Sequence, residues 1–166
     1  MSGELIYSTD ILAPKHKISL SFKSKIPLPN ILRNMPEILS RTLDIPLHRV
    51  YEPTFMWDVS GEPVDIYCKW VVAETELDPH SVIRIIVEIF AKYDRKTGEA
   101  WGTINIKGFI DTTFHYTTII DKKFKEAFMK TLYKKRRAEL RKIGRIYMEK
   151  IEKTLRELFR VEVRAT

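Results

Sequence analysis

The chain is poor in several residue types, and each shortage excludes a class of protein. Glutamine is absent from the 166 residues, and six glycines with eight prolines are too few for a collagen-like or low-complexity chain. A single cysteine, Cys68, cannot form an internal disulfide, which is typical of a reducing compartment. No window holds the ~18 uncharged apolar residues that a membrane span needs. Residues 1–15 lack a basic-then-apolar leader, so we expect a cytoplasmic protein.

The residues that are abundant predict a folded protein with a basic surface. Apolar residues make up 44% of the chain, which is enough for one hydrophobic core, and the length favours a single domain over residues 1–166. The scarcity of amide side chains beside 31% charged residues resembles the composition of thermophile proteins, with many ion pairs. The 29 Lys and Arg against 22 Asp and Glu give a net charge of +7, which favours a polyanionic partner.

Alternating apolar and polar residues predict an α+β body between residues 17 and 118. Two short helices are expected after the first strand, since Pro36 would break one continuous helix. Short turns between the remaining strands predict an antiparallel sheet of five to six strands. The expected strands are 17–25, 50–59, 64–72, 81–93 and 99–110, with 111–118 either continuing the last one or forming a sixth.

Residues 120–160 show a helical period, with apolar residues spaced three or four apart, and predict one long basic amphipathic helix. Its only weak point is Gly144, which would permit a bend. About forty helical residues span roughly 60 Å, whereas a compact globule of this size is roughly 40 Å across. We therefore expect the helix to bend near Gly144 or to extend beyond its own sheet.

An overhanging helix would expose an apolar stripe, which folded proteins seldom leave uncovered. The same stripe from a second copy, related by a twofold axis, would cover it. The sequence thus predicts a homodimer whose interface consists of Ile143, Tyr147, Ile151, Leu155 and Leu158.

The positive charge of the chain is concentrated in the same segment. Residues 122–160 hold 15 Lys or Arg and 5 Glu, a net +10, so with +7 overall the remainder carries −3. Seven cations in twelve residues exceed the alternating charges of an ordinary solvated helix face. We predict that they bind the phosphate backbone of structured RNA, with the ribosome as the most abundant structured polyanion of a cytosol. The alternatives are a thermophile's charged surface, and contact with an acidic protein or lipid surface. The seven residues are Lys134, Lys135, Arg136, Arg137, Arg141, Lys142 and Arg145.

The sequence predicts no catalytic site, metal site or cofactor. The four histidines lie more than thirty positions apart, and the glycines are not spaced as in nucleotide-binding loops. Cys68 falls on an apolar strand face, which favours a buried, inert thiol. The polar run 112–118 is interpreted as an edge strand, and the acidic stretch 74–78 as a solvated strand end. The sequence therefore indicates a protein that is not an enzyme.

The order of elements over residues 17–159 is a strand, two short helices, an antiparallel meander and a long terminal helix. This order resembles the helix-grip fold of the START and Bet v 1-like superfamily, which usually has seven strands and a shorter, less basic last helix. The resemblance implies a sheet wrapped around the last helix, often with a cavity for apolar ligands. The second hypothesis is accordingly a carrier for a hydrophobic small molecule, with a cavity lined by Phe55, Trp57, Trp70, Phe90 and Trp101.

Overall fold

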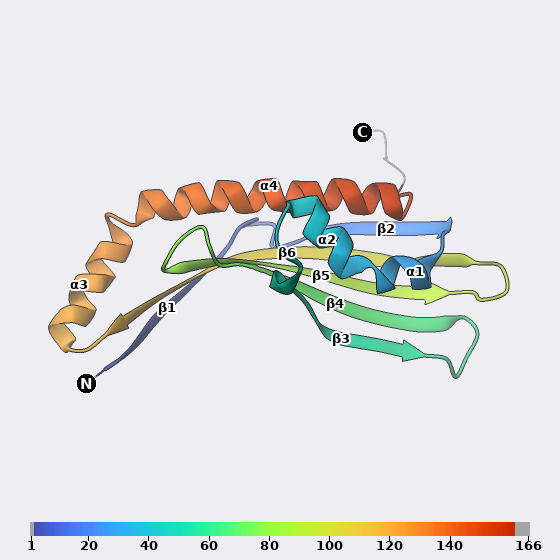
Figure 1. The fold of residues 1–166 in the computed structure, drawn as a ribbon, viewed down its shortest axis with the longest axis horizontal. Helices are drawn as coiled ribbons and strands as arrows, with labels where there is room; N and C mark the ends of the chain where they lie inside the picture. Colours follow the sequence, from blue (N-terminus) through green and yellow to red (C-terminus); the bar gives the residue numbers. More distant parts are fainter. Residues whose placement is uncertain (1, 162–166) are drawn as a thin grey trace.

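The computed structural model describes residues 2–161, without the side chains of residues 52 and 53. Within these residues the chain is α+β, as the sequence predicts, with six antiparallel strands and a long C-terminal helix (Figure 1). The strands are β1 (Gly3–Asp10), β2 (Ile18–Lys25), β3 (Val50–Asp58), β4 (Val64–Glu74), β5 (Ser81–Tyr93) and β6 (Glu99–Tyr116). The helices are α1 (Leu28–Arg33), α2 (Met35–Leu43), the 3-10 turn η1 (Leu47–Arg49), α3 (Ile119–Lys130) and α4 (Lys134–Leu158).

Strand β6 organises the sheet because it is long enough to pair with two strands along one edge. The order is β1-β6-β5-β4-β3, and β2 also pairs with β6, beyond the stretch that pairs with β1. The predicted strand at 99–110 therefore continues through the polar run to Tyr116. Strand β1 was not predicted, so the two short helices follow the second strand of the sheet instead of the first.

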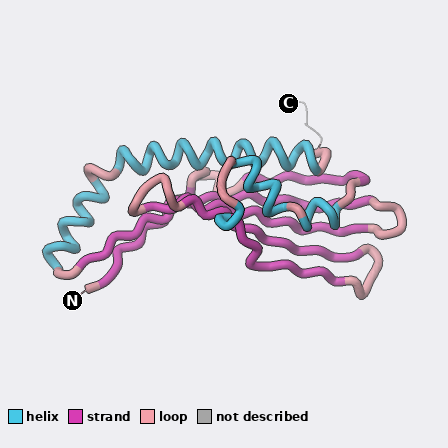
Figure 2. The backbone as a smooth tube through the Cα atoms, viewed as in Figure 1, coloured by secondary structure: helices cyan, strands magenta, loops and turns pink. Residues whose placement is uncertain are grey.

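The sheet has one covered face and one open face. Helices α1, α2 and α4 pack on the covered face, as both views of the backbone show (Figures 1 and 2). Along β4 and β5 every second residue is buried there, including Cys68, Trp70 and Ile89, because the side chains of a strand alternate between faces. The intervening residues, including Tyr67 and Phe90, lie on the open face.

Two glycines allow α4 to approach the body closely. A Cβ atom on Gly108 of β6 would lie 2.5 Å from Met148 Sδ, and one on Gly144 of α4 would lie 2.5 Å from Ile11 Cδ1. Gly108 therefore marks a close approach, one of the two roles that a glycine in a strand indicates. Gly144 does not mark a bend, since α4 runs through it as continuous helix.

The long helix predicted over 120–160 is divided in two at Thr131–Tyr133. Helix α3 ends at Lys130, and α4 starts at Lys134 with 25 residues, which is about 38 Å of helix. Tyr133 is buried at this break against Phe114 and Met129, and its backbone N–H donates to Phe128 O at 3.0 Å. The burial of Tyr133 at the end of the sheet sets the position of the break. Helix α4 lies along the sheet and does not overhang it (Figure 1).

Candidate polyanion-binding surface

The seven cations predicted to bind RNA all lie on the first three turns of α4, but they face in two directions. The three lysines and Arg145 are exposed, whereas Arg136, Arg137 and Arg141 are half-buried. All four arginines contact the body of the protein. The cluster is therefore partly a structural clamp and partly a free surface.

Arg136 holds α4 to the turn between β4 and β5. Its Nε donates to Asp78 Oδ2 at 3.1 Å, its Nη2 donates to the carbonyl oxygen of Leu77, and its Nη1 donates to Glu139 Oε2 at 3.1 Å. Hydrogen bonding to Asp78 and Glu139 raises the pKa of Arg136, so this guanidinium stays charged. Removing the side chain would release the turn from the helix.

The other three arginines contact β1 and the segment that follows it. Arg141 donates from Nε to Ile11 O at 3.0 Å and from Nη2 to Ala13 O at 3.1 Å, and Arg145 Nε donates to Ile11 O at 3.2 Å. Arg137 Nη2 donates to the hydroxyl of Thr9, while its Nε is buried without a partner. Burial lowers the pKa of Arg137, whose charge is the least well compensated of the four.

The lysines have no such role. Lys134, Lys135 and Lys142 are exposed, and no carboxylate of the described chain forms an ion pair with any of them. Arg145 is also exposed apart from its single bond to Ile11. Four solvent-facing cations, Lys134, Lys135, Lys142 and Arg145, thus remain from the predicted seven, and we call them the α4 cation set.

A buried polar network fixes the start of α4. Asp78 accepts hydrogen bonds from Tyr133 OH, from the His80 backbone N–H at 2.9 Å and from Arg136, and the Ser81 hydroxyl lies 2.8 Å from Tyr133 OH. Burial would raise the pKa of Asp78, but these three donors outweigh it and hold that pKa below its ordinary value. Burial and the Asp78 carboxylate raise the pKa of Tyr133 to about 12. The pair therefore persists as a carboxylate and a neutral phenol at neutral pH.

The acidic stretch 74–78 was interpreted as a solvated edge, and for two of its residues that is wrong. Glu74 and Asp78 are both buried, and Glu74 Oε1 lies 2.6 Å from Arg49 Nη1. Sequence reasoning missed these anchors because their partners lie 25 and 58 positions away along the chain. The described residues contain no group of three acidic, histidine or cysteine side chains that would hold a metal ion.

The stripe assigned to a dimer interface is covered by the chain itself. Ile151 and Leu155 are fully buried in the core, and Ile143, Tyr147 and Leu158 pack against that core from its edge. The expectation that this stripe lies exposed on an overhang is wrong, because α4 is short enough to lie entirely on the sheet and α2. The prediction of a dimer through these five residues has lost its physical basis.

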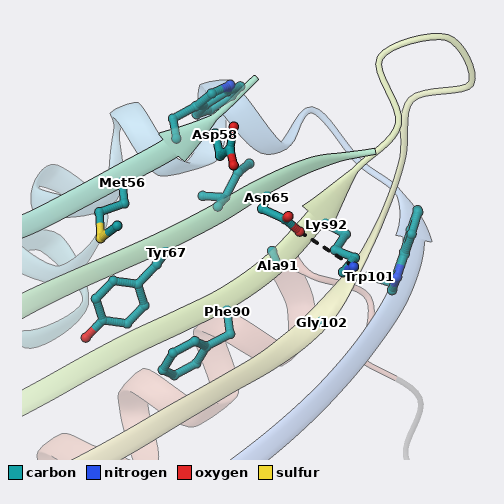
Figure 3. A pocket seen from close by; sticks show the side chains of 11 residues that line it. Met56, Asp58, Asp65, Tyr67, Phe90, Ala91, Lys92, Trp101 and Gly102 are labelled. Atoms are coloured by element: carbon teal, nitrogen blue, oxygen red, sulfur yellow. Dashed lines mark ion pairs between the residues drawn. The ribbon is translucent and has the colours of Figure 1, made fainter. Parts of the chain in front are cut away.

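The apolar residues proposed to line a ligand cavity are divided between the faces of the sheet. Trp70 is fully buried beneath the helices, and Trp57, which is paired with buried Ile66, packs against the same core. Phe90 and Trp101 line an open concavity of about 890 Å³, whose edge includes Trp57 and which Phe55 does not reach. Figure 3 shows Tyr67 and Phe90 together at one end of it, and the ion pair of Asp65 and Lys92 with Trp101 at the other. The concavity lies on the open face, not between sheet and helix.

Sequence reasoning also missed a basic and apolar surface on α3. Lys123 and Lys130 are exposed there beside Ile120 and Phe124. The signal was present in the net charge of residues 122–160, but a single continuous stripe would have placed the apolar residues of this segment inside. The break at Thr131–Tyr133 separates the two helical faces.

Two further findings bear on the class of protein. Among the described residues, the structure has no helix with the length and apolarity to cross a bilayer. No family model, no curated protein and no solved structure matches this chain.

Proposed function

We propose that this chain is a non-enzymatic cytoplasmic protein that docks on structured RNA, with the ribosome as the expected example. The observation that carries the proposal is the α4 cation set, four solvent-facing cations on the first three turns of α4, where the other three cations are engaged with the body. A buried, reduced Cys68 agrees with a cytoplasmic setting.

The spacing of this set suits a phosphate backbone. Lys134 and Arg145 are eleven positions apart, which is about 16 Å along a helix. A nucleic-acid duplex carries one negative charge per about 1.7 Å of its axis, so several phosphates lie within reach. The clamping arginines hold α4 rigid, and a rigid display loses less entropy on binding than flexible side chains on a mobile segment.

The test is salt-dependent binding of a structured RNA, with variants of the exposed lysines. Four phosphate contacts predict a slope near −0.9 × 4 for affinity against salt on logarithmic scales, and about a hundredfold loss of affinity between 50 and 200 mM salt. Reversing two charges, Lys134→Glu with Lys135→Glu, should lower affinity at least roughly tenfold and reduce the slope by about two. Arginines are unsuitable targets, because substituting them would also remove contacts between α4 and the body.

The matched control is Lys25→Glu with Lys96→Glu. Both lysines are exposed, and they lie at the end of the sheet away from α3 and the start of α4. The two double variants change net charge equally, so a non-specific attraction to RNA would weaken equally in both. Equal weakening, or no RNA binding by the unaltered protein at low salt, would contradict the proposal.

The concavity on the open face supports a second candidate function, binding of a hydrophobic small molecule. Its volume of about 890 Å³ falls in the range of ligand pockets, and apolar and aromatic side chains form much of its wall. It differs from the helix-grip expectation, in which the ligand lies between sheet and helix. That superfamily assignment stays a prediction.

Titration with an uncharged solvatochromic dye tests this candidate. Phe90→Ala should weaken dye binding roughly tenfold, because the exposed Phe90 ring lines the concavity. Phe55→Ala is the control, since Phe55 is similarly exposed on β3 but does not line the concavity. Equal affinity in both variants would exclude this site.

A further inference from the structure

Helix α3 presents large apolar side chains to solvent at one end of the molecule. We call Ile119, Ile120, Phe124 and Leu132, together with Lys123 and Lys130, the α3 patch. The first four are 59%, 82%, 69% and 76% exposed respectively. Ile120 and Phe124 are one helical turn apart, so they share a face of α3 with Lys123. Exposed apolar side chains that cluster in this way commonly mark an interaction site.

The opposite side of α3 is well anchored, so the outward face is a stable display. Met129 is buried and Phe128 half-buried against Phe114 and Tyr133, with Phe128 and Phe114 in edge-to-face contact at 6.0 Å. The hydroxyl of Thr118 accepts the Asp121 N–H at 3.1 Å and caps the start of the helix. Figure 1 shows α3 beyond the start of α4, over the paired ends of β1 and β6.

The charge around the α3 patch is mainly positive, although the half-buried Glu126 lies one helical turn from both Lys123 and Lys130. Lys123 and Lys130 are exposed, and no ion pair joins either of them to a carboxylate of the described chain. Asp121 points away from the patch into contacts with Lys125 and the Thr117 N–H.

The combination of apolar side chains and lysines in the α3 patch favours one kind of partner surface over two others. A second copy would bring the lysines of two patches together, and a helix of about 18 Å offers far less than the roughly 800 Å² per partner of a stable interface. Nucleic acid would neutralise the lysines but would leave the isoleucines and Leu132 in water. An anionic lipid surface matches both components, since it accepts apolar side chains below a layer of negative headgroups.

We propose that α3 docks on anionic lipid surfaces. Ile120, Phe124 and Leu132 enter the boundary between headgroups and acyl chains, and Lys123 and Lys130 contact the negative headgroups. The helix lies in the plane of the surface and does not span it. This inference goes beyond the docking on RNA, because it uses the apolar face of α3 and not the α4 cation set.

Vesicle co-sedimentation of the full chain tests the proposal. Vesicles of phosphatidylcholine mixed with phosphatidylglycerol should bind the protein, and vesicles of phosphatidylcholine alone should bind it much more weakly. The variant Ile120→Ser with Phe124→Ser should lower partitioning onto the anionic vesicles by roughly tenfold or more. Both side chains are exposed, so the variant is expected to fold, which circular dichroism checks. Phe55→Ser, an exposed aromatic on β3 outside the concavity, is the control and should bind like the unaltered protein.

Three outcomes would overturn the proposal. Equal binding to both kinds of vesicle would remove the role of charge, and unchanged binding by the Ile120 and Phe124 variant would reduce the effect to adsorption of lysines. Concentration-dependent dimers that this variant abolishes would assign the patch to a second copy. RNA binding is measured separately. The Ile120 and Phe124 variant should retain it, whereas Lys134→Glu with Lys135→Glu should weaken it at least roughly tenfold. Failure of one proposal is thus distinguishable from failure of the other.

Discussion

Helices α3 and α4 are neighbours along the chain and similar in composition, yet the apolar stripe of α4 is buried and that of α3 is exposed. Helix α4 lies over the broad part of the sheet and beside α2, which cover Ile151 and Leu155 completely. Helix α3 lies over the end of β6, where β1 alone continues to pair with it beyond Thr112. These two strands give α3 less area to pack against than the broad part of the sheet gives α4. The helical period thus predicts an apolar face, whereas the area of sheet beneath the helix decides whether that face is buried.

The cations of the two helices differ in the same way. Arg136, Arg141 and Arg145 of α4 are engaged with carbonyl or carboxylate oxygens of the body, and the lysines of both helices mostly face solvent. The planar guanidinium suits several directed hydrogen bonds at once, whereas the strongly hydrated ammonium is held less easily in one geometry. In a basic segment of this kind, arginines and lysines should be counted separately when the number of solvent-facing cations is predicted.

The largest effect should come from truncating the stripe of α4. Leu155→Ala removes a fully buried side chain and should lower the free energy of unfolding by about 2–5 kcal/mol. Leu132→Ala, in the exposed α3 patch, should change it by no more than about 0.5 kcal/mol. Urea denaturation of both variants measures the difference. Similar losses would show that the patch is covered in solution and would remove the contrast between the two helices.

The junction between the helices should be the next most sensitive point. Asp78→Asn removes the charge that accepts hydrogen bonds from Tyr133 and Arg136, and should cost about 1–3 kcal/mol of unfolding free energy near neutral pH. The pKa of Asp78 is lowered on folding, so its contribution is present above the ordinary pKa of an aspartate, near 4. The deficit of the variant should therefore shrink as pH falls below about 4. A deficit that stays constant in acid would contradict this assignment.

Removing the hydroxyl of Tyr133 should lower the free energy of unfolding less than Asp78→Asn does, and with the opposite dependence on pH. Tyr133→Phe loses the bonds to Asp78 and Ser81 and should cost roughly 1 kcal/mol at pH 7. Folding raises the pKa of Tyr133 to about 12, so its contribution is complete below the unfolded value near 10 and disappears as pH rises through about 12. Unfolding followed at several alkaline pH values should show the two proteins converging over this range.

The smallest effect should come from Arg137, the clamp residue with an unpaired buried Nε. Arg137→Met keeps the length of the side chain and removes a poorly compensated charge, so the free energy of unfolding should change by less than about 1 kcal/mol, with stabilisation the expected direction. Arg141→Met, which loses bonds to two carbonyl oxygens, is the matched comparison and should be destabilising. Thermal unfolding of the two variants should therefore differ in sign.

Several elements were predictable because their signals are local. The alternation along β4 and β5 and the turn before β6 predict the meander, and Gly98 of that turn does adopt a positive φ of 75°. Strand β1 was missed because an edge strand is covered on one side only, and half-buried Leu5 and Tyr7 beside exposed Ile6 give a weak alternation. The break at Thr131–Tyr133 was missed because the apolar period runs through it.

The candidate surface was predictable in its location and not in its membership. A count of Lys and Arg places the positive charge after residue 122, since charge is a property of composition. Which cations are free depends on Ile11, Ala13 and Asp78, which lie more than fifty positions away from them along the chain.

The sequence by itself determined the α+β class, the antiparallel meander and a C-terminal segment that is helical and basic. These properties follow from the spacing of residues within one element, which the chain carries locally. Only the tertiary structure decided that α4 is covered, that α3 is exposed, and that arginines clamp while lysines remain free. Those outcomes depend on which distant residues the fold brings within a few ångströms, and on how much sheet lies beneath each helix.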